Sequence, residues 1–371
     1  MTWKPDHRYA VPEVDQIDSP ALLVFPEVIA RNIDRVLEMT ATEDGHCLQP
    51  HIKTVKCREV AEMALSRGIT RFKCSTVSEG ELLGAAGARR VLLSYQLSEV
   101  KARRWGELRR LYPETEFSSL VDNAATARML SARFADHPLP VYVDLNMGMD
   151  RTGLPPADAV DLLRLLETLP GLELRGFHVY DGHIRDTEEA VRRDRATAVF
   201  DEVERLRSSA EAQYGRSLEV VVAGSPNFPF YVGKRNTWVS PGTFFLWDSG
   251  YGSSFPEWPF EPAALLLTRV LSVIDGNTLC FDLGSKAVAA DPPQPRVYFP
   301  GIDQYEIRGQ WEEHLVITVP DTSGYEVGQV HWAVPRHVCP TVNLYEELLP
   351  VTAGRVGEGW SVAARKQKIT V

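Results

Sequence analysis

The chain has 371 residues, of which 44% are hydrophobic, and a formal net charge of −10 at pH 7. A chain of this length can bury a sizeable core and form one large domain with a smaller second one. The acidic balance argues against nucleic acid or an anionic membrane as the main partner, because both favour a basic protein surface.

Short apolar runs alternate with amphipathic helical patterns through about the first 245 residues. The runs occupy residues 47–53, 71–77, 90–96, 116–122, 140–147, 174–180, 218–225 and 237–244. Patterns between them, such as REVAEMALSRG and PADAVDLLRLLETLPG, end in Gly or Pro-Gly, as helices often do. Eight strands alternating with helices predict an α/β fold, a (β/α)8 barrel of the TIM type, which we place at residues 20–245. The alternative is a doubly wound open sheet, although no glycine-rich dinucleotide fingerprint follows the first run.

The pattern changes after about residue 245. The segments ALLLTRVLSVIDG, TLCFDLGSKAVAA, HLVITV and RKQKITV, separated by Gly, Asp and Pro, are typical of antiparallel strands joined by turns. We therefore expect a second, mostly antiparallel β domain at residues 246–371, joined by residues 1–19.

The compartment is predicted from the start of the chain and from the cysteines. The opening MTWKPDHRYAVPEVDQ lacks the basic and then apolar regions of a signal peptide, and no apolar run reaches 18 residues. Five scattered cysteines, an odd number, indicate reduced thiols. We expect a cytoplasmic protein that acts on a small molecule.

The active site of a parallel barrel forms at the carboxyl ends of its strands, so the residues that end each run are candidates. They are Lys53 after the first run, Arg151 after the fifth, Tyr180 and His183 after the sixth, Gly224 and Ser225 after the seventh, and Gly242 and Thr243 after the eighth. Glycine, serine and threonine in the last two loops favour a phosphate site, since bare N–H groups and hydroxyls bind phosphate oxygens. An ordinary turn is the alternative for any one glycine–serine pair.

The stretch LQPHIKTVK, residues 48–56, contains Lys53, which is the last residue of the first run. A lysine that faces a phosphate site suits a Schiff base with pyridoxal phosphate, because desolvation and nearby positive charge free its nucleophilic amine. His51 lies two residues earlier and would share a face with Lys53 on a strand. The alternative is a surface lysine at a strand end.

Five motifs carry a resemblance to a known family. PHIK, MGMDRTG, YDGH, SPGTF and PRHVCPTVN resemble the alanine-racemase-like, fold type III pyridoxal phosphate enzymes, in the branch of D-threonine aldolases and eukaryotic-type D-serine dehydratases. The resemblance runs from SPALLVF at residue 19 to the closing segments. It implies that Lys53 forms the internal aldimine, Arg151 lies near the phenolic oxygen, Tyr180 lines the ring, and the loops around Gly224 and Gly242 hold the phosphate. It also implies a homodimer in which the β domain of one subunit closes the active site of the other.

The same branch uses a divalent metal, and His337 and Cys339 are candidate ligands. On a strand these residues, two apart, would point to one face and could chelate one ion. A core histidine beside an inert thiol is the alternative. Thiolate and imidazole favour zinc, although manganese or cobalt is possible in aldolase-like relatives. The remaining ligands would be waters or the substrate, whose β-hydroxyl the metal would activate.

Two reactions and one binding role stay open. Retro-aldol cleavage of D-β-hydroxy-α-amino acids to glycine and an aldehyde, with D-threonine as the reference substrate, is the preferred prediction, with His183 or His51 as the general base. The alternative is a D-serine or D-threonine dehydratase that yields a keto acid and ammonia, with Lys53 removing the Cα proton. The His-x-Cys pair resembles the dehydratases, whereas YDGH and SPGTFFLWDSGY resemble aldolases. A non-catalytic pyridoxal phosphate carrier is a third possibility, but it would need no metal.

The position two residues after Lys53 departs from the family pattern. The stretch after the Schiff-base lysine often reads K-x-H-K in this family, but Val55 stands here in place of the histidine. The change removes one polar neighbour from the predicted site.

Overall fold

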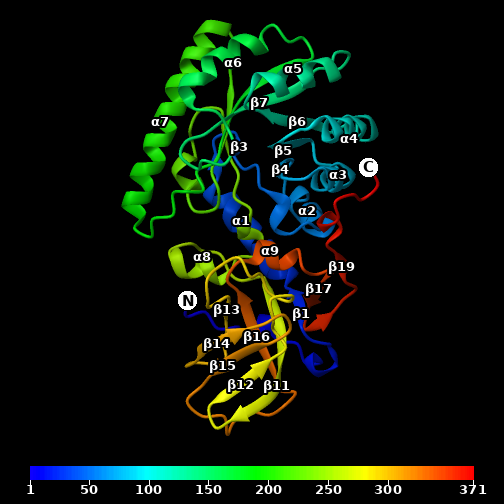
Figure 1. Ribbon diagram of the computed structural model, residues 1–371, viewed down its shortest axis with the longest axis vertical. Helices are drawn as coiled ribbons and strands as arrows, with labels where there is room; N and C mark the ends of the chain where they lie inside the picture. The colour runs from blue at the N-terminus through cyan, green and yellow to red at the C-terminus, as the bar shows by residue number, and fades with distance from the viewer. The chain divides into compact units, whose positions relative to one another are not determined.

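The computed structural model describes all 371 residues, which form two compact units (Figure 1). The barrel unit comprises residues 36–53, 61–242 and 366–371, and the β unit comprises residues 1–35, 54–60 and 243–365. Two helices, α1 (Pro26–Met39) and α2 (Arg58–Leu65), have residues in both units. No helix has both the length and the apolar character needed to cross a membrane.

The barrel unit contains a sheet of seven parallel strands in sequential order. The strands are β4 (Arg71–Cys74), β5 (Arg90–Gln96), β6 (Glu116–Val121), β7 (Leu139–Leu145), β8 (Leu172–Val179), β9 (Glu219–Val222) and β10 (Thr237–Val239). Each overlaps one of the last seven predicted apolar runs, although β7 and β8 begin one and two residues before theirs. The strand order never reverses, so the doubly wound alternative is excluded and the barrel-like α/β prediction is confirmed.

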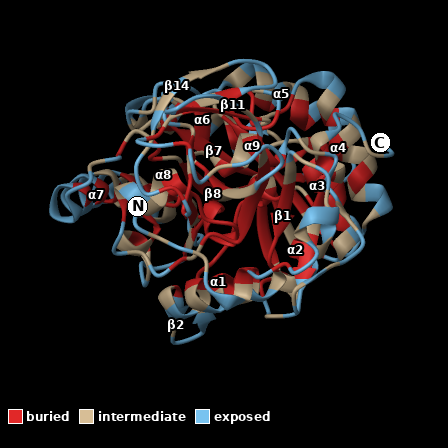
Figure 2. Ribbon diagram, turned by 90° about the horizontal axis from the view of Figure 1, so that it is seen from below, coloured by how far each residue is buried: buried red, intermediate tan, exposed pale blue.

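Helices connect the strands and cover the outside of this sheet (Figure 1). They are α3 (Val77–Ala86), α4 (Glu99–Leu111), α5 (Ala124–Arg133), α6 (Ala159–Leu166) and α7 (Glu189–Tyr214), while β2 (Ala41–Thr42) and β3 (Gly45–His46) form a short hairpin. Thr76, Ser98 and Asn123 accept backbone hydrogen bonds and cap α3, α4 and α5, as N-cap residues do. Every residue of β7 is buried, as expected for a parallel strand that is covered on both faces (Figure 2).

The first predicted run, residues 47–53, is not a regular strand. It makes isolated parallel bridges from Leu48 to Val239 of β10 and from His51 to Lys73 of β4. Pro50 has no N–H to donate, and a short 3-10 helix, Ile52–Thr54, follows. The segment thus joins the two edges of the sheet, but the prediction of a regular eighth strand was wrong.

Charged and apolar side chains fill the interior of the barrel unit in layers. Arg71 of β4 pairs with Glu219 of β9 at 2.6 Å and lies 3.7 Å over the ring of Trp238 of β10. The Tyr142 hydroxyl of β7 also donates to Glu219, at 2.6 Å. An apolar cluster made by Leu92, Leu120, Tyr142 and Val221 packs against Trp238. Side chains from four strands meet here, so Arg71 points into the barrel.

The β unit is built on a ten-stranded, mostly antiparallel sheet, which confirms the predicted class. Its strands are β1 (Ala21–Val24), β11 (Ala264–Asp275), β12 (Thr278–Phe281), β13 (Val297–Tyr298), β14 (Glu306–Gln310), β15 (Leu315–Thr318), β16 (Val330–Pro335), β17 (Glu347–Thr352), β18 (Arg355–Val356) and β19 (Trp360–Ser361). Two short helices, α8 (Ser249–Ser254) and α9 (Val338–Val342), complete it. The β11 strand pairs with β1, β12 and β16, and β1 also pairs in parallel with β17.

The closing segment RKQKITV is not the antiparallel strand that its sequence suggests. Residues 366–371 belong to the barrel unit, where the N–H groups of Thr370 and Val371 donate to the Glu81 carboxylate of α3. Arg104 of α4 donates to the Val371 carbonyl at 2.7 Å. Because side chains bind these backbone groups, no strand partner is needed.

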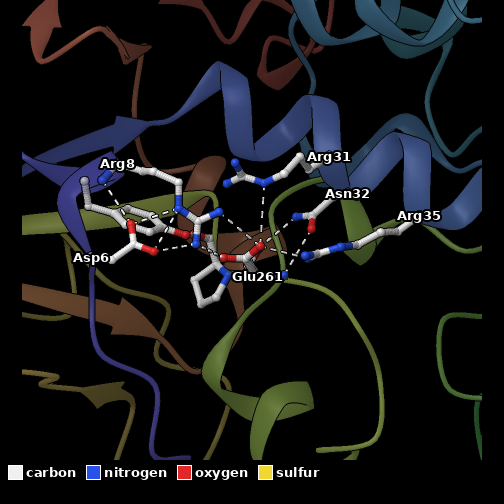
Figure 3. A network of polar contacts seen from close by, with 8 residues as sticks. Asp6, Arg8, Arg31, Asn32, Arg35 and Glu261 are labelled. Atoms are coloured by element: carbon white, nitrogen blue, oxygen red, sulfur yellow. Dashed lines mark hydrogen bonds and ion pairs between the residues drawn. The ribbon is translucent and has the colours of Figure 1, made fainter.

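A cluster of charges around Glu261 ties the start of the chain to the loop before β11 (Figure 3). Glu261 pairs with Arg8 at 2.5 Å and with Arg35 at 2.9 Å, and Arg31 lies 3.6 Å away. Asn32 exchanges two hydrogen bonds with the Glu261 backbone, at 2.8 and 3.0 Å. Burial alone raises the pKa of Glu261, but the hydrogen bond from Arg8 and the charges of the three arginines outweigh it and leave that pKa below its usual value.

Candidate active site

Lys53 lies half-buried in the short helix that ends the joining segment. Its backbone N–H donates to Nδ1 of His51 at 3.3 Å, and the His51 Nε2 atom lies 3.4 Å from the Ser94 hydroxyl. The expected sharing of one strand face is wrong, because residues 52–54 are helical. Both nitrogens of His51 have partners, and the ring supports the backbone at Lys53.

Arg151 and Tyr180 lie together at the end of the barrel unit where β7 and β8 finish. The Arg151 guanidinium lies 4.9 Å over the Tyr180 ring. Both residues line a small cavity with Ser94, Leu120, Asp144, Leu145, Met149, Thr152 and His178. The structure therefore brings two of the predicted cofactor residues to one cavity.

His183 packs against the loop that follows β7. A Cβ atom at Gly148 would lie 2.9 Å from its Nε2 atom, so only glycine allows this approach. Gly148 also has a φ of +111°, a conformation that other residues rarely adopt. The Nδ1 atom of His183 is buried and has no hydrogen-bond partner.

The two predicted phosphate loops already use some of their N–H groups. The Gly224 N–H donates to Oδ1 of Asp181 at 3.1 Å, and the Gly242 N–H donates to the Ser225 hydroxyl at 3.3 Å. Thr243, the next residue, belongs to the β unit and is also buried. The phosphate-binding roles of these glycines stay predictions.

Two polar residues inside the barrel unit were not among the predicted site residues. Asp144 of β7 binds Nδ1 of His178 of β8 at 2.7 Å, and Gln96 donates to the same carboxylate at 2.9 Å. The Nε2 atom of His178 is buried without a partner in the cavity described above. Burial lowers the pKa of His178, although the Asp144 carboxylate opposes this shift.

The sequence signal for Asp144 and His178 is the alternation of side chains between the two faces of a strand. His178 lies two residues before Tyr180, which directly follows β8, so strand alternation predicts that both side chains point to the same side. The prediction considered only the residues that end each run, so it missed Asp144 and His178, which lie within β7 and β8.

A second lysine, Lys73 of β4, was also missed. It is only 2% exposed. Burial, and after it the charge of Lys53, lowers the pKa of Lys73 to about 7. Its run, RFKCSTV, looked like any buried strand, and nothing in the residue spacing marked the lysine.

The candidate metal ligands lie in the β unit but not on a strand. The β16 strand ends at Pro335, His337 is the residue before α9, and Cys339 lies in the first turn of that helix. The strand argument for their shared face is therefore wrong. The two side chains nevertheless meet, because Cys339 is a hydrogen-bond partner of the His337 ring.

The surroundings of this pair suit a metal site. Nδ1 of His337 lies 2.6 Å from the Asp291 carboxylate, and Sγ of Cys339 lies 3.1 Å from the Thr54 hydroxyl. A carboxylate on one ring nitrogen of a histidine leaves the other for a metal, which is a common arrangement. Burial alone lowers the pKa of His337, but Cys339 and Asp291 outweigh it and raise that pKa to about 9. No cluster of three or more His, Cys, Asp or Glu residues is placed to hold an ion, so a metal here would need water or substrate ligands.

Comparison with known families agrees with the division of the chain into a barrel unit and a β unit. Residues 26–249 match the family model of the alanine racemase N-terminal domain, and residues 263–351 match that of the putative serine dehydratase domain. The chain belongs to the alanine racemase N-terminal domain family. Membership implies a pyridoxal phosphate cofactor, and the unpartnered Nε2 atom of His178, in the cavity of Arg151 and Tyr180, leaves a buried polar atom there for a ligand.

Individual relatives of this alanine-racemase-like chain are similar along its whole length. A D-threonine aldolase of Arthrobacter sp. is 27% identical over 365 residues, 94% of this chain and 93% of that one. A 3-hydroxy-D-aspartate aldolase of Paracoccus denitrificans (strain Pd 1222) is 26% identical, over 96% of this chain and 95% of that one. The crystal structure of D-threonine aldolase from Filomicrobium marinum superposes with a TM-score of 0.83 at 28% identity, and covers 97% of this chain and 99% of that one.

Proposed function

We propose that the protein is a pyridoxal phosphate- and divalent metal-dependent lyase that cleaves D-β-hydroxy-α-amino acids to glycine and an aldehyde. D-threonine is the reference substrate. The observation that carries the proposal is the end-to-end similarity to two aldolases. Two local arrangements support it: Arg151 and Tyr180 line one cavity, and His337 contacts Cys339.

Lys53 is the proposed attachment point of the cofactor. Arg151 and Tyr180 would hold its ring, and the loops with Gly224, Ser225, Gly242 and Thr243 would hold its phosphate. When bound, pyridoxal phosphate supplies an electron sink for the bond that breaks at Cα. The protein contributes orientation and charge around that bond.

His337 and Cys339 are the proposed ligands of a zinc or manganese ion. The Asp291 carboxylate would keep a proton on Nδ1 of His337 and so present Nε2 to the ion. When bound, the ion polarises an oxygen ligand such as a hydroxyl. Waters or the substrate would complete its coordination.

His183 is the proposed general base for the β-hydroxyl proton. His51 was the other candidate, but its two ring nitrogens contact the Lys53 N–H and the Ser94 hydroxyl. Nδ1 of His183 has no partner, and its Nε2 faces the loop at Gly148. These contacts favour His183.

Product analysis tests the proposal. The purified chain is incubated with D-threonine, D-serine and D-phenylserine, each with and without Zn²⁺ or Mn²⁺. Glycine and an aldehyde from D-threonine and D-phenylserine are expected. A keto acid and ammonia as the only products would contradict it.

Dehydration is the second candidate function. It is favoured by the match of residues 263–351 to the putative serine dehydratase domain and by the thiol in the His-x-Cys pair. In that reaction Lys53 would remove the Cα proton. Bound pyridoxal phosphate without any turnover would instead indicate the carrier role.

We also propose a cytoplasmic homodimer with the active site at the subunit interface. The proposal rests on the family resemblance. Light scattering during size-exclusion chromatography tests it, because a dimer would have twice the 41.5 kDa mass of the chain. A monomer at micromolar concentration with full activity would contradict it.

A further inference from the structure

Helix α9 begins with a histidine at the position where a capping residue normally stands. The first N–H groups of a helix have no partner within it, and Ser, Thr, Asp or Asn at the N-cap usually accepts one of them. His337 holds the N-cap position of α9, and its side chain makes no capping hydrogen bond. The N–H of Val338, a fully buried residue, is the first of these groups and needs an acceptor from elsewhere in the chain.

Asp248 supplies that acceptor from a distant part of the sequence. Its Oδ2 atom accepts a hydrogen bond from the Val338 N–H at 3.1 Å, and its Oδ1 atom accepts one from the Tyr251 N–H of α8 at 2.9 Å. Asp248 is only 2% exposed. One buried carboxylate therefore caps the starts of two short helices, α8 and α9, which both belong to the β unit.

The two residues that follow this carboxylate bind the segment that leads into His337. The Gly250 N–H donates to the Arg336 carbonyl at 3.1 Å, and the Ser249 hydroxyl donates to the Pro335 carbonyl at 3.1 Å. A Cβ atom at Gly250 would lie 2.4 Å from the Arg336 carbonyl oxygen, so only glycine allows this approach. Backbone on both sides of His337 is thus held by one short turn.

The backbone just before Asp248 is strained. Trp247 has a φ of +49°, in the left-handed region that a bulky residue rarely adopts. Its buried ring packs against Phe260 with 5.1 Å between the ring centroids. Strain of this kind persists only where the surrounding contacts impose it, and it is often found at functional sites. The strain at Trp247 therefore favours a functional role for the turn that follows.

We propose that Asp248 is a positioning residue of the candidate metal site. Because Asp248 caps α9 in place of His337, the His337 ring is left for an ion, and Cys339 in the first turn of the same helix stays beside it. Both oxygens of Asp248 are engaged by N–H groups, so it acts through the backbone and not as a ligand. The inference rests on the proposed function, since His337 and Cys339 are the proposed ligands.

A carboxylate suits this position because both of its oxygens accept hydrogen bonds. In Asp248→Asn an NH2 group, which can only donate, replaces one of the oxygens. That group would face either the Val338 N–H or the Tyr251 N–H, and in both orientations one N–H loses its acceptor. The link between α8 and α9 would be lost, and the two proposed ligands would no longer be held together.

Zinc binding by variants tests the role of Asp248. The metal-free, full-length chain is titrated with Zn²⁺ in competition with a chromophoric chelator, and urea denaturation checks that each variant is folded. Asp248→Asn should bind zinc about tenfold more weakly, a loss that is usual for residues that orient a metal ligand. The matched control is Asp282→Asn, whose carboxylate accepts a hydrogen bond from the Arg269 N–H of β11 at 2.8 Å in the same unit. It should bind zinc as the native chain does.

Hydrogen exchange in the native chain gives a second measurement that needs no variant to fold. If the cap strengthens zinc binding about tenfold, zinc must stabilise the cap by the same factor, because the coupling is reciprocal. Zinc should therefore slow the exchange of the Val338 amide about tenfold. The Arg269 amide, which donates to Asp282, should exchange at the same rate with and without zinc. An unchanged exchange rate at Val338 would overturn the inference.

The outcomes separate this inference from the proposed function. Zinc affinity of folded Asp248→Asn within twofold of the native value, or an equal loss in Asp282→Asn, would overturn the role of Asp248 alone. No zinc binding by the native chain would overturn the metal site and this role together. Zinc binding that depends on Asp248, without any aldehyde from D-threonine, would overturn the proposed reaction and leave the role of Asp248 intact.

Discussion

Replacing Asp291 with alanine should weaken metal binding to the β unit without removing a ligand. The carboxylate lies 2.6 Å from Nδ1 of His337 and would fix which ring nitrogen faces the ion. Loss of such a partner typically reduces metal affinity by about 10- to 100-fold. The side chains of His337 and Asp291 are 44% and 52% exposed, so water can replace the carboxylate. We therefore expect about a tenfold loss, roughly 1.4 kcal/mol.

Metal binding is measured on the full-length, metal-free chain by competition with a chromophoric chelator for Zn²⁺. Pyridoxal phosphate is left out, so the readout does not depend on activity. Asp291→Asn should fall between the native protein and Asp291→Ala, because an amide oxygen still accepts a hydrogen bond from the ring.

Asp303→Ala is the matched control, since it removes an exposed carboxylate of the same unit that pairs only with Lys4. It should bind zinc as the native chain does. Zinc affinity of Asp291→Ala within twofold of the native value, or an equal loss in Asp303→Ala, would refute the reasoning.

Three other outcomes follow from the structure. Glu261→Gln should lower the free energy of unfolding by about 1 to 2 kcal/mol at pH 7, measured by urea denaturation. Because the pKa of Glu261 is lowered in the folded state, the difference between the variant and the native protein should persist above pH ~5 and shrink as the pH falls below ~4. The control Glu312→Gln changes an exposed carboxylate and should have little effect. Gly148→Ala should reduce kcat at least tenfold by displacing His183. The control Gly45→Ala, at a residue with a similar φ of +120° but free space around its Cβ, should keep full activity. An equal loss of kcat in both variants would point to backbone strain alone. Dialysis against a chelator should abolish cleavage of D-threonine, and added Zn²⁺ or Mn²⁺ should restore it. Full activity after verified metal removal would rule out a role of the metal in this reaction.

The fold was predictable because the signal for parallel strands is local. Runs such as PVYVDLNM and LRGFHVY are rich in apolar residues, and they cover most of β7 and β8. The first run was different because Pro50 interrupts the backbone ladder and a short helix follows it. Its role in joining the sheet edges depends on β4 and β10, which lie far away in the sequence.

Site residues were predictable from the sequence only where a reactive side chain also ends a run or lies two residues from another candidate ligand. Lys53 ends a run, and the spacing of His337 and Cys339 marked them as a pair, although a helix start rather than a strand brings them together. Asp144, His178 and Lys73 lie inside strands, where one polar residue in an apolar run does not reveal its partner. Only the closed arrangement of the strands shows that they face one another.

The joining segment has a consequence for the motions of the barrel unit. Residues 47–53 attach to β10 and β4 by one bridge each, whereas β7 and β8 share a ladder of seven residue pairs. The segment can separate while breaking few hydrogen bonds, so the amides of Gln49 and Lys73 should exchange with solvent sooner than those of Val141 and Val143. A molecule covalently held at Lys53 would slow this local opening. Amide exchange at the two seams would then report occupancy of the lysine without any turnover.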